Sequence, residues 1–132
     1  MSRDIVDFSS GEIVQYEPAS PIELELLIRT IGDRLENAVP VLKQLWHDRY
    51  QAERVLIETK AKAMLLSKAS TIAEKRAEAE LASLPQRMDF DAAKETLHAA
   101  EELQKALTAK LYGFLNLNKA QATAYNASGI GR

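Results

Sequence analysis

The chain has 132 residues, of which 46% are hydrophobic and 27% charged, the composition of one folded domain rather than of a disordered segment. It contains no cysteine, which excludes disulfide bonds and thiolate metal sites. The formal net charge of -2 gives no overall attraction to nucleic acid. We find neither a secretory signal nor a membrane-spanning apolar run and therefore expect a soluble, cytoplasmic protein with no membrane contact.

Residues 1–20 predict a separate N-terminal arm. Ile5–Phe8 and Ile13–Tyr16 are β-prone runs separated by Ser9, Ser10 and Gly11, which is the composition of a small hairpin. An isolated hairpin is marginal in water, so an extended arm that orders against a partner is an equal alternative.

A long helix is predicted from Pro21 to Lys68. Ser20 and Glu23 form a capping box around Pro21, which suits the first helical position. Apolar residues then repeat with a heptad period, which predicts packing against another helix. The seam consists of Leu24, Ile28, Ile31, Leu35, Ala38, Leu42, Leu45, Ala52, Leu56, Ala63 and Leu66, interrupted only by Arg49 and Thr59.

Pro40 lies inside this helix, but the heptad phase is the same on both sides of it. We therefore expect a bent, continuous helix, with a break near residues 37–39 as the alternative. Trp46 and Tyr50 follow at helical spacing, which favours aromatic packing at a helix contact over a ligand pocket.

The second arm of the chain is predicted to start at Thr71, which forms a capping box with Glu74. A short helix with one apolar face follows and is predicted to end at Pro85. That face comprises Ala77, Leu81 and Leu84. Asp89 or Asp91 would cap the last helix, whose seam is Phe90, Ala93, Leu97, Ala100, Leu107, Leu111 and Phe114, with polar interruptions at Gln104 and Asn118.

These elements predict an all-α fold: a long antiparallel, coiled-coil-like helical hairpin over residues 21–126, with its second arm broken at Pro85 and a flexible tail at 127–132. Apolar residues also lie off both seams, and two helices bury too narrow a strip to cover them. We therefore expect two hairpins to form a homodimeric helical bundle. The off-seam residues are Leu26, Leu27, Val39, Val41, Val55, Ile57, Leu65, Leu103, Leu115 and Leu117.

Motifs for chemistry are nearly absent. Glu95 and His98 have the Glu-x-x-His spacing of di-iron bundles, but the nearest counterpart, Gln44 with His47, lacks the carboxylate. No nucleophile elbow or phosphate-binding glycine loop is present. We expect no cofactor, no metal and no enzymatic activity.

The C-terminal stretch is a candidate contact for nucleic acid or a partner. No acidic residue follows Glu102, and lysines alternate with aromatic residues, as in proteins that bind single strands. The candidate residues are Lys105, Lys110, Tyr112, Lys119 and Tyr125. The overall acidity and the predicted burial of Phe114 favour an ordinary solvated helix face instead.

The order of a long heptad helix, Lys62–Leu66, the Ser70–Lys75 turn, Ala77–Leu81 and a last helix rich in leucine and asparagine resembles small α-helical proteins of phages and prophages. Such proteins often accompany genes for single-strand annealing and recombination. The resemblance implies a non-enzymatic protein that binds a phage or host protein in DNA metabolism or defence, with a DNA-binding recombination accessory as the alternative. It transfers no site residue.

Overall fold

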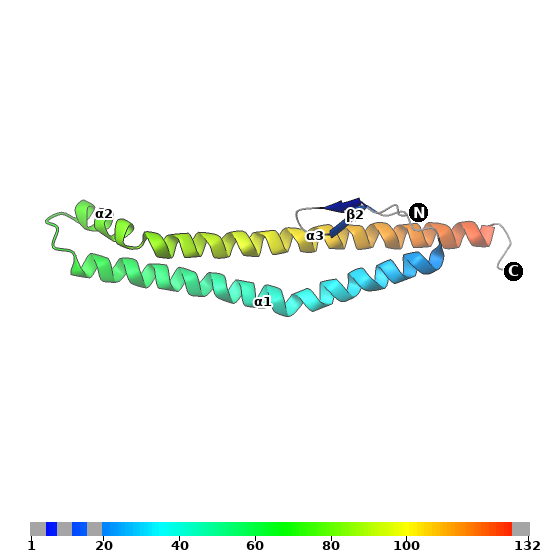
Figure 1. The fold of residues 1–132 in the computed structure, drawn as a ribbon, viewed down its shortest axis with the longest axis horizontal. Helices are drawn as coiled ribbons and strands as arrows, with labels where there is room; N and C mark the ends of the chain where they lie inside the picture. The colour runs from blue at the N-terminus through cyan, green and yellow to red at the C-terminus, as the bar shows by residue number, and fades with distance from the viewer. Residues whose placement is uncertain (1–4, 8–11, 16–19, 128–132) are drawn as a thin grey trace. The chain divides into compact units, whose positions relative to one another are not determined.

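The computed structural model describes residues 5–7, 12–15 and 20–127, and the fold is all-α. Three helices follow one another: α1 (Pro21–Leu66), α2 (Ile72–Ala82) and α3 (Leu84–Ala127) (Figure 1). Two short strands, β1 (Ile5–Asp7) and β2 (Glu12–Gln15), precede them and pair antiparallel, with a register shift between Ile5 and Val6. Phe8 and Tyr16 of the predicted hairpin, and residues 128–132 of the predicted tail, lie outside the described residues.

Side chains cap the starts of α1 and α2, as predicted. The Ser20 hydroxyl accepts a hydrogen bond from the Glu23 N–H at 3.2 Å, and the Thr71 hydroxyl accepts one from the Glu74 N–H at 3.1 Å. Each bond satisfies a backbone donor that has no partner inside its own helix. α1 is continuous through Pro40, which decides between the two alternatives for this residue.

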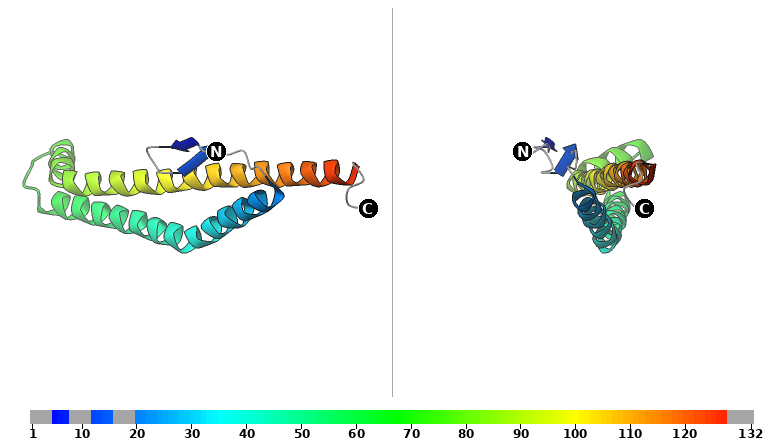
Figure 2. Two further views of the ribbon diagram at one scale, coloured as in Figure 1. Left: turned by 45° about the vertical axis from the view of Figure 1, so that its right-hand side comes forward. Right: turned by 90° about the vertical axis from the view of Figure 1, so that its right-hand side faces the viewer.

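The chain divides into two compact units, one of residues 1–36 with 106–132 and the other of residues 37–105. In the second unit, α1 and α3 lie side by side (Figures 1 and 2). α1 runs antiparallel to α2 and α3. Arg49 of α1 reaches Phe90 of α3, whereas Lys60, further along α1, pairs with Glu80 of α2, which precedes Phe90 in the chain. The most buried residues of this unit are Leu56, Ala79, Ser83 and Leu97.

The first unit contains the beginning of α1 and the end of α3. Where the structure describes this unit, the most buried residues are Leu24 and Ile31 of α1 with Leu107 and Phe114 of α3. All four belong to the predicted seams. Along α1 the predicted seam is buried or half-buried from Leu24 to Ala63, and only Leu66 at its end is exposed.

The joint between α2 and α3 differs from the prediction. α2 ends at Ala82, and Pro85 lies in the first turn of α3, where a missing N–H leaves no helical hydrogen bond unmade. Asp89 and Asp91 are therefore interior residues of α3 rather than caps. Ser83 occupies the joint, and its buried hydroxyl donates to the Ala79 carbonyl at 2.7 Å.

The predicted apolar face of α2 is also wrong. Ala77, Leu81 and Leu84 are exposed, whereas Ala79 is completely buried. Ala79 shares the lining of a small cleft with Lys60 and Met64 of α1, so a small side chain lies where α2 faces α1. The predicted face of Ala77, Leu81 and Leu84 has a different helical phase from the α3 seam, which favoured a break at Pro85. The buried positions Ala79 and Ser83 instead continue the three-four spacing of the α3 seam through Gln86 and Phe90.

Candidate interaction surface

A cluster of aromatic and basic side chains lies beside the seam in the second unit. Arg49, at a seam position of α1, is half-buried, and its guanidinium carbon lies 5.4 Å from the Trp46 ring centroid and 5.6 Å from that of Tyr50. The two rings are 5.6 Å apart and tilted by 33°. Cation–π attraction therefore gives this charge a partner without a carboxylate.

α3 completes the cluster with Phe90 and Lys94. The Arg49 guanidinium carbon lies 5.7 Å from the centroid of the Phe90 ring, and the Lys94 ammonium nitrogen lies 4.4 Å from the same centroid. Trp46 is 37% exposed and Tyr50 46%, so the rings are not core residues. The predicted aromatic packing is present, but it leaves a surface of Trp, Tyr and Arg, the residue types enriched at interface hot spots.

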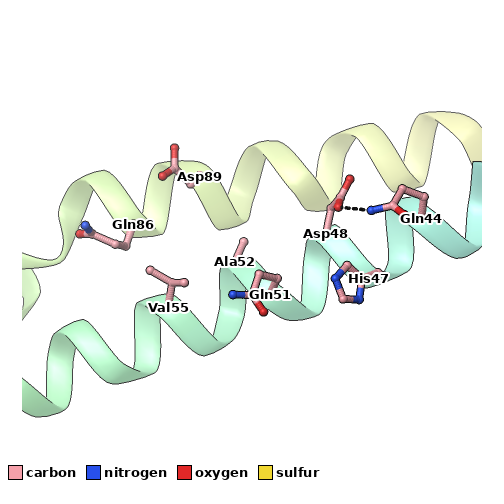
Figure 3. A pocket seen from close by; sticks show the side chains of 8 residues that line it. All are labelled: Gln44, His47, Asp48, Gln51, Ala52, Val55, Gln86 and Asp89. Atoms are coloured by element: carbon pink, nitrogen blue, oxygen red, sulfur yellow. Dashed lines mark hydrogen bonds between the residues drawn. The ribbon is translucent and has the colours of Figure 1, made fainter.

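A cleft of about 350 Å³, lined mainly by residues with polar side chains, lies between α1 and α3 in this unit (Figure 3). α1 contributes most of its lining, including His47 and Asp48, and α3 contributes Gln86 and Asp89. The amide nitrogen of Gln44 donates to Asp48 at 2.8 Å. The cleft is open, and its polar groups do not converge on one point, as those of a built ligand site would.

Many large apolar side chains are exposed along the helices. On α1 they are Ile22, Leu26, Val39, Val41, Val55, Ile57, Leu65 and Leu66, besides Trp46 and Tyr50; on α2 and α3 they are Ile72, Leu81, Leu84, Met88, Tyr112, Leu115, Leu117 and Tyr125. Eight of the ten predicted off-seam residues on α1 and α3 are exposed, five of them by more than half of their surface, and the other two, Leu27 and Leu103, are half-buried. Exposed apolar surface of this extent is typical of interaction sites.

The five residues predicted as a nucleic-acid or partner contact do not form one cluster. Lys105 belongs to the second unit and pairs with Glu102 at 3.1 Å, whereas the other four belong to the first unit. There, Tyr112 is 63% exposed, and Lys119 lies two turns further along the same face of α3. Lys110 is half-buried, and Tyr125 lines an apolar cleft with Pro21.

In the described residues, three carboxylates whose pKa is lowered each have a lysine partner. A hydrogen bond from Lys105 lowers the pKa of Glu102, helped by the charges of Lys105 and His98. Lys62 lowers the pKa of Glu58 in the same way, and a hydrogen bond from Lys60 lowers that of Glu80. Among the described residues, no three histidine or acidic side chains gather as a metal site would require, so Glu95 and His98 have no further ligands there.

Sequence reasoning did not group Arg49 with Phe90 and Lys94. The available signal was a basic residue at a seam position with Trp46 three residues before it and Tyr50 directly after it. The contact with α3 depends on how the two helices are aligned, which the heptad pattern leaves open.

None of the helices in the described part of the chain combines the length and the apolar character needed to cross a membrane. No protein-family model, curated protein or solved structure matches the chain.

Proposed function

We propose that the chain is a non-enzymatic interaction protein that binds other proteins, beginning with a second copy of itself, through the exposed faces of its helices. The observation that carries this proposal is that more large apolar side chains are exposed to solvent than hydrophobic residues are buried. In the described residues, eighteen large apolar side chains are exposed, against seven buried hydrophobic residues. A core this small gives little stability alone, and association is the direct way to remove the remaining surface from water.

The resemblance to small helical phage proteins suggests what a further partner would be: a phage or host protein in DNA metabolism or defence. Such a partner would add a helix to an exposed apolar face, which is a common mode of peptide and helix recognition. The aromatic and basic cluster around Arg49 offers the anchors that such contacts use.

A second candidate function is binding of single-stranded DNA as a recombination accessory. Its support is the exposed Tyr112 ring two turns from Lys119 on one face of α3, an aromatic platform beside a positive charge. The dispersal of the remaining candidate residues makes this the weaker proposal.

Two measurements on the full chain separate the candidates. Sedimentation equilibrium at micromolar concentration should give a mass above the 14.7 kDa of one chain. Fluorescence anisotropy with labelled oligothymidine, at low and high salt, should show no binding. A monomeric mass together with salt-dependent binding that is lost in Lys110→Gln/Lys119→Gln would reverse the choice in favour of the second candidate.

A further inference from the structure

One face of α1 in the second unit carries a row of side chains that the described part of the chain leaves exposed, except for the half-buried Glu53. We call this row the α1 stripe. Its successive members are four, three, four, three and four residues apart, so they fall within a band about 80° wide along the helix. The α1 stripe consists of Val39, Lys43, Trp46, Tyr50, Glu53 and Ile57.

The four apolar members of the α1 stripe are all exposed. Val39 is 62% exposed and Ile57 59%, while Trp46 and Tyr50 between them retain 37% and 46%. Arg49 occupies a seam position next to the stripe, and its guanidinium contacts both aromatic rings. These rings are therefore held in place on α1 before any partner arrives, which reduces the entropy that binding would cost.

The α1 stripe is complementary to its own order read in reverse: apolar residues keep their chemical type, and charged residues exchange sign. Reversal about position 48 exchanges Trp46 with Tyr50, one aromatic ring for another. The same reversal exchanges Lys43 with Glu53, which have opposite charges. It also exchanges the two β-branched residues at the ends, Val39 and Ile57. A surface with this symmetry is complementary to a second copy of itself when the copy runs in the opposite direction.

The charges of the α1 stripe distinguish the antiparallel arrangement from the parallel one. In the described residues, neither Lys43 nor Glu53 makes an ion pair or a hydrogen bond through its side chain. An antiparallel copy would place each lysine opposite a glutamate, twice per interface. A parallel copy in register would instead place lysine opposite lysine and glutamate opposite glutamate, which is unfavourable.

We propose that two copies of the chain associate antiparallel along the α1 stripe, about a twofold axis that passes between Trp46 and Tyr50. Trp46 packs on Tyr50 of the second copy, Lys43 pairs with Glu53, and Val39 contacts Ile57. This inference rests on the self-association in the proposed function and adds the surface, the direction and the register of the dimer.

Charge reversal tests the pairing of Lys43 with Glu53. Lys43→Glu and Glu53→Lys should each raise the dimer dissociation constant at least tenfold in sedimentation equilibrium, because each places two like-charged pairs in the interface. The double variant Lys43→Glu/Glu53→Lys should return to within about threefold of the original chain, since it exchanges the charges without changing their complementarity. Lys62→Glu is the control for position: Lys62 lies on another side of α1 and pairs with Glu58, so its reversal should weaken that pair within the helix and leave association unchanged.

Cysteine cross-linking tests the register, and the absence of cysteine from the chain makes the result unambiguous. A mixture of Val39→Cys and Ile57→Cys chains should form a disulfide-linked heterodimer on mild oxidation. Val39→Cys alone should not, because its two copies would lie about 27 Å apart along the helix axis, well beyond the reach of a disulfide. Val41→Cys mixed with Ile57→Cys is the control, since Val41 is equally exposed but outside the stripe.

The outcomes separate the register from the self-association on which it rests. A monomeric original chain would overturn both. A dimeric original chain whose dissociation constant is unchanged by either charge reversal would overturn the register and leave self-association standing. Cross-linking of Val39→Cys with itself would show a parallel pair and equally overturn the proposal.

Discussion

Arg49 shows how a charged residue is accommodated where the heptad pattern predicts an apolar one. Its position in the seam leaves the side chain half-buried, and no carboxylate pairs with it in the described residues. The guanidinium instead lies against the rings of Trp46, Tyr50 and Phe90. A planar, weakly hydrated cation is suited to this environment, and a lysine ammonium less so.

Leu97 provides the residue-scale test of the seam. It is 3% exposed, so Leu97→Ala should reduce the free energy of unfolding by roughly 2 to 5 kcal/mol, through lost transfer free energy and a residual cavity. Urea unfolding followed by circular dichroism measures this change. Leu81→Ala is the control: Leu81 is 75% exposed and should cost far less. Equal losses for both variants would contradict the assigned burial.

At the scale of the elements, the sequence predicted the parts that depend on local chemistry. The caps at Ser20 and Thr71 and the seam positions from Leu24 to Ala63 follow from hydrogen bonding within a turn and from helical period. The face of α2 could not be predicted from size and hydrophobicity, because α2 turns the small Ala79 toward α1 and leaves Leu81 outside. Pro85 was predicted to end the short helix but lies in the first turn of α3, because proline suits both places and local sequence does not distinguish them.

Ala79→Leu tests the orientation of α2. Ala79 is completely buried, so the three additional carbon atoms of leucine would have to displace residues of α1 or shift α2 away from α1. We expect a loss of about 1 to 3 kcal/mol in the free energy of unfolding, as for other overpacked sites. Ala77→Leu, at an exposed position of the same helix, should be nearly neutral. A neutral Ala79→Leu in the same urea titration would mean that α2 does not face α1 through this residue.

The Lys60–Glu80 ion pair joins α1 to α2 and predicts a pH dependence. Lys60 lowers the pKa of Glu80 below its ordinary value of 4.5 in the folded chain. Because the folded pKa is the lower one, the stabilisation is complete above the ordinary value and is lost as the pH falls toward the folded pKa. Glu80→Gln should therefore be less stable than the original chain near neutral pH, with the difference shrinking below about pH 4. Thermal unfolding across this pH range would show the change, with Glu95→Gln as the control because Glu95 has no ion pair in the described residues. A stability difference that is independent of pH would exclude the ionised pair as its source.

At the scale of the whole molecule, the candidate surface could be predicted only in part. The heptad pattern identified the off-seam apolar residues, and the structure leaves most of them exposed, including Val39, Val41 and Ile57. The self-complementary order of the α1 stripe was present in the sequence, but it can pair two copies only because its apolar residues are exposed. Exposure depends on where α3 lies around α1, and the period of one helix does not determine that.

Association of this kind makes thermal stability depend on concentration, because unfolding of a dimer releases two chains. With an unfolding enthalpy near 0.7 kcal/mol per residue, summed over two chains, the melting temperature should rise by roughly 2 to 3 °C for each tenfold increase in protein concentration. Circular dichroism melts over two decades of concentration measure this slope. Lys43→Glu serves as the internal comparison: it should melt at a lower temperature at every concentration, because its free energy of association is less favourable. A melting temperature that does not change with protein concentration in the original chain would show that the chain folds as a monomer. Its exposed apolar faces would then bind a protein other than a second copy.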